Sequence, residues 1–222
     1  RIRRSDYLRI AHDQEMVGAL ADLALGQRLF GLDHQLVVGV QFDRNDHDRF
    51  NDSPFRFTDF VDLMPEDRGF YQSLDPYGPR TATDIEQRSI FLDSALDLNP
   101  AVKLVSGWRF DQSRVDSLNA LSGARFDKRY SAPSWRIGAV YAPGNTAWYA
   151  SWSTSSEPPA QITTLGLANA SFDLTDGEQF EIGLKHAADW GDATLAVYDL
   201  ARTNLLSRDP ADPNRLIQIG KR

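Results

Sequence analysis

Apolar and polar residues alternate along several segments of this chain, which is the pattern of a β-strand with one face in an apolar environment. The alternation predicts an all-β protein whose strands are joined by turns and by irregular polar segments. The predicted strands cover residues 34 to 44, 86 to 98, 101 to 112, 133 to 142, 146 to 154, 178 to 188, 192 to 203 and 214 to 220.

The connections between the predicted strands alternate between short turns and long polar segments. Each turn is built from residues that have a preset or permissive backbone, such as proline, glycine and asparagine. We therefore expect all long loops at one end of an antiparallel sheet, as in bacterial outer-membrane barrels, whereas both ends of a soluble sandwich meet water. The turns are Phe30 to Asp33, Asn99-Pro100, Pro143 to Asn145 and Asp189 to Gly191, and the long loops cover residues 45 to 85, 113 to 132, 155 to 177 and 204 to 213.

The two faces of the predicted strands differ in chemistry. In the strand at 34 to 44, Leu36, Val38 and Val40 alternate with glycine and polar residues, and Val37 is the one exception. A half-buried sheet of a soluble protein alternates in the same way, so this pattern alone leaves both architectures open. Loop asymmetry, together with glycines and charges on the polar face, favours a membrane barrel with a polar lumen. We expect Leu36, Val38, Val40, Leu104, Ile137, Ile182 and Leu184 on the lipid face, and Gln41, Lys103, Arg109, Arg136, Glu181 and Lys185 on the lumen face.

Composition narrows the functional classes. The 222 residues carry a formal net charge of −7 with a pI near 5.1, which gives no support for nucleic-acid binding. No window approaches the roughly 18 apolar residues of a transmembrane helix, so a helical membrane protein is excluded. The chain has no cysteine, which excludes disulfides and cysteine-based zinc sites. No apolar segment of a signal peptide follows Arg1, and the chain stops within a strand pattern at Arg222, so we expect a piece of a longer protein.

Motifs in the second half of the chain carry a family resemblance. Trp148 to Ser153 is followed, after an irregular stretch, by Leu174 to Lys185. These two segments resemble consecutive strands of TonB-dependent outer-membrane receptors of the siderophore type. The resemblance extends from about residue 15 to the end of the chain. Further motifs in the family's order are His34 to Val40, Ser106 to Asp111 and Ala196 to Asn204.

The resemblance implies an antiparallel transmembrane β-barrel fragment with short periplasmic turns and long extracellular loops. Residues 1–222 would supply about 9–10 of the 22 strands of such a barrel, without the plug domain or the C-terminal closing strand. The implied function is uptake of a ferric siderophore or a similar scarce chelate across the cell outer membrane. Its implied partners are outer-membrane lipid and the TonB complex, which acts through the plug. The alternative is a soluble secreted or periplasmic β-sandwich, such as a carbohydrate-binding module; the open-ended termini disfavour a small self-contained barrel.

The predicted loop at 45 to 85 is the best candidate for ligand contact. It contains seven aromatic residues and several arginines, and loops longer than about 12–15 residues are usually functional or disordered. Aromatic faces and cations suit an anionic, partly aromatic iron chelate. The alternative is that these aromatics only pack the loop onto the rim of the barrel. The expected ligand-binding residues are Phe70, Tyr71, Tyr77 and Arg80.

No motif predicts catalysis, a cofactor or a bound metal. Residues 43 to 52 are rich in oxygen ligands, but they lack the glycine and glutamate of an EF-hand loop, and interleaved arginines offset the charge. The histidines His12, His34, His47 and His186 have no spacing typical of a metal site. No G-x-S-x-G elbow or phosphate-binding glycine loop is present. We therefore expect a transport protein and not an enzyme.

Overall fold

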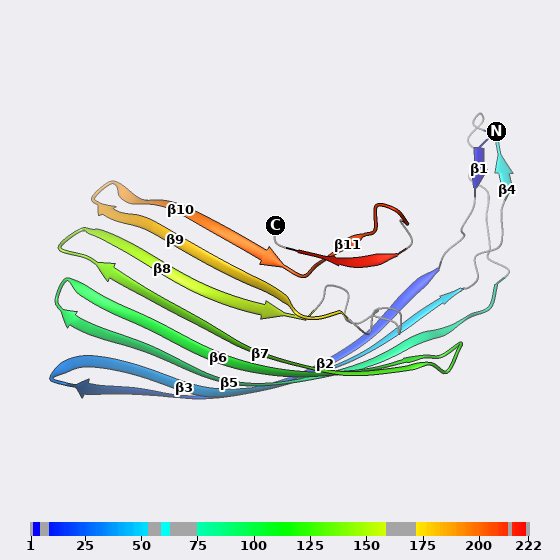
Figure 1. Ribbon diagram of the computed structural model, residues 1–222, viewed down its shortest axis with the longest axis horizontal. Coiled ribbons are helices and arrows are strands. Elements are labelled where there is room, and N and C mark those ends of the chain that lie inside the picture. Colours follow the sequence, from blue (N-terminus) through cyan, green and yellow to red (C-terminus); the bar gives the residue numbers. More distant parts are fainter. Residues whose placement is uncertain are drawn as a thin grey trace.

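The main element of the fold is a single antiparallel sheet. The computed structural model describes residues 2–4, 9–52, 59–62, 75–158, 172–212 and 215–220. Eight strands form the sheet in the order β10-β9-β8-β7-β6-β5-β3-β2, and each is antiparallel to its neighbours (Figure 1). These strands are β2 (Ile10–Leu29), β3 (Leu32–Asp52), β5 (Tyr77–Asn99), β6 (Val102–Asn119), β7 (Arg125–Tyr141), β8 (Thr146–Glu157), β9 (Thr175–Ala188) and β10 (Gly191–Thr203).

Two short strand pairs accompany the main sheet. β1 (Ile2–Arg4) pairs with β4 (Asp59–Val61), and β11 (Leu205–Arg208) pairs with β12 (Leu216–Ile219). The predicted strand at 214 to 220 corresponds to β12, which lies outside the main sheet. The predicted fold class, all-β and antiparallel, is confirmed. Within the described residues, no helix is both long enough and apolar enough to cross a membrane.

The connections lie at the two ends of the sheet as predicted. Because strands that follow one another in the sequence also pair, the chain must reverse alternately at one end and at the other. Figure 1 shows the four tight turns together at one end, opposite the ends at which the remaining connections leave the sheet. The tight turns are at residues 30–31, 100–101, 142–145 and 189–190, and the other connections span 53–76, 120–124, 158–174 and the residues after Thr203.

The predicted loops at 45 to 85 and 113 to 132 were wrong in extent. β3 continues to Asp52 and β5 begins at Tyr77, while β6 and β7 are joined by residues 120–124 alone. Asn119 stabilises this short connection. Its side-chain oxygen accepts hydrogen bonds from the backbone N–H groups of Leu121 at 3.0 Å and Ser122 at 3.1 Å. The strand extensions carry polar residues on both faces, so they lack the alternation that reveals a strand.

The first strand of the sheet was missed. β2 forms an edge of the described sheet, and each of its residues is exposed. Its sequence mixes Ala, Gly and Asp with larger apolar residues on both faces, which weakens the period of two. The tight turn at 30–31 nevertheless fixes its register, because Leu29 pairs with Leu32 and the pairing continues without a break to Ile10 and Asn51.

The register confirms the predicted facing of the side chains. Directly paired residues of neighbouring strands share a face, and Val38 pairs through Leu92 with Trp108 and then with Trp135. We call this side the outer face. All seven residues expected toward lipid lie on it: Leu36, Val38, Val40, Leu104, Ile137, Ile182 and Leu184. The opposite side, the inner face, carries Gln41, Lys103, Arg109, Arg136, Glu181 and Lys185, also as predicted.

The inner face is crowded and polar. Phe91 lies over Gly39 so closely that any Cβ at the glycine would overlap the ring. Next to Phe91, Arg109 donates hydrogen bonds to Asp111 at 2.8 Å, to Gln41 at 3.0 Å and to Ser89 at 2.8 Å. Polar groups with so many protein partners suit a wet lumen.

The strands are longer than a membrane requires. A transmembrane β-strand needs about 9–11 residues, whereas β3 has 21 and β5 has 23. On the outer face the apolar band ends at the row of Val40, Ile90 and Phe110, and charged residues follow toward the long-loop end. The strands therefore project beyond the apolar band on that side, and we call these segments the projecting part.

A small core covers the inner face of the projecting part. Val115, Phe126 and Tyr130 are buried there, and Leu174 packs against them. The Lys128 ammonium and the Tyr130 hydroxyl both donate to the backbone carbonyl of Phe172, which precedes β9. The residues just before β9 are thereby tied onto the inner wall.

The facing of β3 makes a testable difference between two adjacent valines. Val38→Arg places a cation on the outer face within the apolar band, which costs about 2–4 kcal/mol near the bilayer midplane. We expect this variant to give much less folded protein in outer membranes. Val37→Arg is the matched control, because residue 37 lies on the inner face opposite Asp93. Equal amounts of both folded variants, measured by heat-modifiable mobility, would contradict a lipid-facing outer face.

Candidate ligand-binding site

Two of the predicted ligand-binding residues lie where β3 and β5 enter their connection. Tyr77 is the first residue of β5 and pairs with Asp52, the last residue of β3. The backbone N–H of Arg9, just before β2, donates to the Asp52 carboxylate at 2.6 Å, and the Asp52 N–H donates back to the Arg9 carbonyl at 3.3 Å. This exchange brings Arg9 to the same place.

Aromatic and cationic groups stack at this point. The rings of Phe50 and Tyr77 lie 6.4 Å apart at an interplanar angle of 26°. The Arg9 guanidinium carbon lies 3.5 Å from the centre of the Tyr77 ring, which is a cation–π contact. Tyr77 still exposes 40% of its surface. We call Arg9, Phe50, Tyr77 and Arg80 the mouth platform.

Arg80 adds a cation whose hydrogen bonds go to neutral groups. Its Nε donates to the Asn51 side-chain oxygen at 2.7 Å, and its Nη2 donates to the Pro76 carbonyl at 2.7 Å. Among the described residues, neither Arg9 nor Arg80 forms an ion pair with a carboxylate. The mouth platform thus carries two arginine cations, with the Asp52 carboxylate beside the Arg9 backbone.

The four predicted ligand-binding residues have different outcomes. Tyr77 and Arg80 lie together on the mouth platform, at the end of the sheet where the long loops were expected. Tyr77 also packs against its neighbours, as the alternative interpretation held. Phe70 and Tyr71 lie outside the described residues. A ligand-binding role for all four stays a prediction.

A pair of histidines on the inner face was not predicted. His12 Nδ1 and His47 Nε2 are 2.9 Å apart, and the two ring centres are 5.0 Å apart. Both residues belong to the projecting part, where burial lowers the pKa of His47 below its ordinary value and the neighbouring His12 lowers it further. The short distance between the two nitrogens is a hydrogen bond between the rings. The pair follows from the register of β2 and β3. The turn at 30–31 sets Gln14 opposite His47, and His12 lies two residues from Gln14 on the same face.

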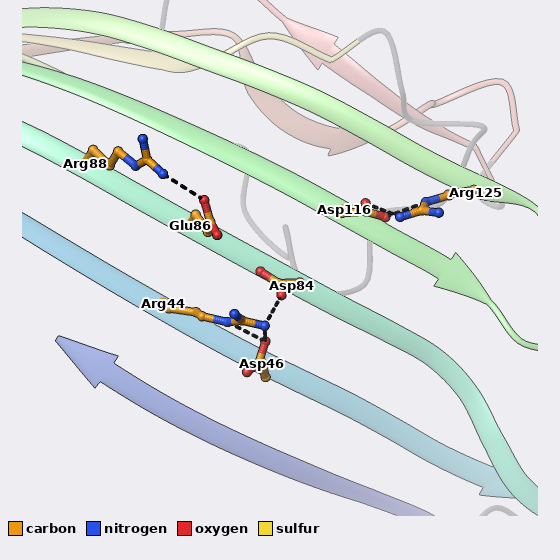
Figure 2. Close-up of polar contacts among 7 residues, drawn as sticks. All are labelled: Arg44, Asp46, Asp84, Glu86, Arg88, Asp116 and Arg125. Atoms are coloured by element: carbon orange, nitrogen blue, oxygen red, sulfur yellow. Dashed lines mark hydrogen bonds and ion pairs between the residues drawn. The ribbon is translucent and has the colours of Figure 1, made fainter.

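The outer face of the projecting part carries a belt of ion pairs, drawn in Figure 2. Arg44 donates to Asp46 at 3.2 Å and to Asp84 at 2.6 Å, so one guanidinium joins β3 to β5. Arg125 of β7 contacts Asp116 of β6 at 2.5 and 2.9 Å. The directly paired residues of this charged belt form a cation-rich row, Arg44, Glu86, Arg114 and Arg129, and an acidic row, Asp46, Asp84, Asp116 and Asp127.

The charged belt balances repulsion that the register creates. Four aspartates directly opposite one another would destabilise the sheet, since like charges face each other across neighbouring strands. The arginines of the adjacent rows offset this repulsion, with Arg114 reaching Asp127 at 2.6 Å. The pairs are substantially exposed, so each contributes little alone. Across the described residues, no group of three or more His, Asp or Glu side chains is placed to hold a metal ion.

Comparison with known proteins places the chain among membrane receptors. Residues 2–222 match the family model described as TonB dependent receptor-like, beta-barrel. The chain is 31% identical over 193 residues to the ferrichrome outer membrane transporter/phage receptor of Escherichia coli, covering 81% of this chain and 25% of that protein. It is 30% identical over 210 residues to the metal-pseudopaline receptor CntO of Pseudomonas aeruginosa, covering 87% of this chain and 28% of that protein. The chain thus spans about a quarter of these curated relatives.

Solved structures share the same fold. The siderophore receptor PiuA of Acinetobacter baumannii superposes with a TM-score of 0.77 at 20% identity, over 96% of this chain and 34% of that one. The ferripyoverdine receptor of Pseudomonas aeruginosa superposes with a TM-score of 0.73 at 18% identity, over 97% of this chain and 29% of that one. At these identities the likeness concerns the fold alone.

The Arg125–Asp116 pair predicts a pH-dependent stability. The hydrogen bond from Arg125 lowers the pKa of Asp116 below its ordinary value, so the stabilisation is complete above the unfolded pKa of about 3.9. It is lost as the pH falls through the lower, folded value. We expect Arg125→Ala to lower the thermal midpoint slightly at pH 6, and by less as the pH falls below about 4. A difference that is independent of pH would contradict the pairing.

Proposed function

We propose that this chain, which belongs to the TonB-dependent receptor β-barrel family, forms part of the wall of a transporter that takes up a ferric siderophore or a similar metal chelate. Barrels of this family lie in the outer membrane, and the apolar band on the outer face is the surface that meets lipid. The chelated metal is cargo and arrives inside its chelator.

The mouth platform is the observation that carries this proposal. It presents an exposed aromatic ring and two cations that have no carboxylate partner among the described residues, at the long-loop end of the sheet. Such a surface attracts an anionic chelate electrostatically and offers its apolar parts a ring to stack on. The substrates named for two relatives, a ferrichrome transporter and a metal-pseudopaline receptor, support chelates as the substrate class.

The open edges of the sheet support the view that the chain works within a longer receptor. In the described part, β2 and β10 each pair on one side only. Unpaired backbone groups at membrane depth cost several kcal/mol each, by general estimates, so further strands must cover both edges. We infer that the remaining strands, a plug domain and the TonB complex complete the transporter, as the family resemblance implies.

The soluble β-sandwich is set aside as an alternative. A sandwich buries its apolar residues between two packed sheets. Here the apolar side chains of the outer face stay exposed, among them Val40 at 54% and Ile182 at 52%. Together with the family match over residues 2–222, this exposure fits a wall against lipid.

Truncating the mouth platform tests the proposed function. We expect Tyr77→Ala in the full-length receptor to weaken binding of its ferric chelate several-fold, because an aromatic contact contributes about 0.5–1.5 kcal/mol beyond area burial. Arg80→Ala should weaken binding of anionic chelates more than that of neutral ones. Binding is measured with purified receptor and a panel of hydroxamate, catecholate and carboxylate ferric siderophores.

The matched control is Trp190→Ala, which removes an exposed aromatic residue at the opposite, tight-turn end. Surface expression is measured in parallel. Unchanged affinity of the Tyr77 and Arg80 variants at equal expression would show that the platform only packs the rim. Absence of binding and uptake for every chelate in the panel would count against the transport function itself.

A further inference from the structure

We propose that His12 and His47 bind the metal ion of the incoming chelate directly, each through one imidazole nitrogen. The inference rests on the proposed function, because it concerns the ion that the transported chelate carries. It narrows the substrate class to chelates of first-row transition metals whose chelator leaves two neighbouring coordination positions open. The observation that carries it is the juxtaposition of two imidazoles from different strands on the inner face, in the projecting part.

The separation of the two nitrogens suits this role. When metal–nitrogen bonds are about 2.1 Å long, two neighbouring ligands of an octahedral or square-planar ion lie about 3.0 Å apart. The His12 Nδ1 and His47 Nε2 atoms are 2.9 Å apart. In a tetrahedral site the separation would be about 3.4 Å. The pair is therefore spaced for two cis positions, and rotation of the rings, which are now inclined at 42°, turns both lone pairs toward one ion.

The surroundings of His47 favour the form of its imidazole that binds metal. An imidazole must be neutral to act as a ligand, and His47 is 6% exposed with a pKa lowered by burial and by its histidine neighbour. Beside the pair on the inner face, the Gln14 amide donates to the Asn45 side-chain oxygen at 2.9 Å, which braces β2 against β3. Neutral imidazole nitrogen suits Ni²⁺, Cu²⁺ and Zn²⁺.

Two histidines fill only part of the coordination shell of a metal ion, and this determines which chelates can bind. No third His, Asp or Glu completes a metal site among the described residues. A bare ion would be held weakly, whereas an ion that already carries a four-donor chelator needs two more ligands in cis positions. A chelator that fills all six positions leaves nothing for the histidines. The pair thus selects chelates by coordination number as well as by charge.

Nickel nitrilotriacetate is a direct probe, because this chelator occupies four octahedral positions and leaves two cis positions open. We expect the untagged full-length receptor to bind one equivalent in calorimetry and to ignore nickel EDTA, in which all six positions are filled. His47→Ala should weaken binding at least about tenfold. His12→Gln should do the same, although its amide retains a hydrogen bond to His47 and so keeps the strands paired. His186→Ala, at the tight-turn end, is the matched control.

Copper nitrilotriacetate adds a spectroscopic readout. Electron paramagnetic resonance of the complex should show two additional nitrogen ligands, reduced to one in either variant. Equal binding of the saturated and unsaturated nickel chelates, or no loss in the His12 and His47 variants, would overturn the proposal. Ferric siderophore uptake is measured on the same receptor. Uptake without nickel chelate binding would overturn this inference alone, whereas binding without uptake of any chelate would count against the proposed function.

Discussion

The structure depends on an antiparallel ladder of backbone hydrogen bonds, whose register in the described sheet shifts only near the strand ends, at Arg49/Phe50 and at Asp97/Asn99. Within the apolar band no water is available to backbone N–H and C=O groups, so each strand must satisfy them through its neighbours. The same ladder assigns every side chain to one of two faces, because successive residues point in opposite directions. Lipid contact, the polar lumen and the placement of the site all follow from this assignment.

The ladder also accounts for features that no single strand explains. The four aspartates of the charged belt lie in one row because the register pairs them directly. The arginines of the adjacent rows offset the resulting repulsion. The histidine pair and the mouth platform are likewise built from residues that are distant in sequence. Arg9 and Tyr77 meet only because β2 and β5 flank β3.

The strands could be predicted from the sequence where one face contacts lipid and the other faces the lumen. Val38 and Leu104 alternate with polar residues because lipid lies on one side and the lumen on the other. Beyond the band the outer face meets water and the inner face mixes polar residues with a small core, so the extension of β3 to Asp52 left no periodic signal. The histidine pair was missed for a related reason: it requires β2, whose small and acidic residues obscure the alternation. Tyr77 and Arg80 were predicted at the correct end of the sheet. They were expected in a loop, whereas the structure has them in strand β5.

The tight turn at residues 30–31 has an evolutionary consequence. Every residue of β2 takes its partner from this one reversal, so inserting or deleting a single residue there would shift the pairing along the whole strand. Insertions in the connection at 120–124 would only lengthen a hairpin tip. New sequence can therefore accumulate on one side of the barrel and not on the other, which lets recognition diversify while the wall is inherited unchanged.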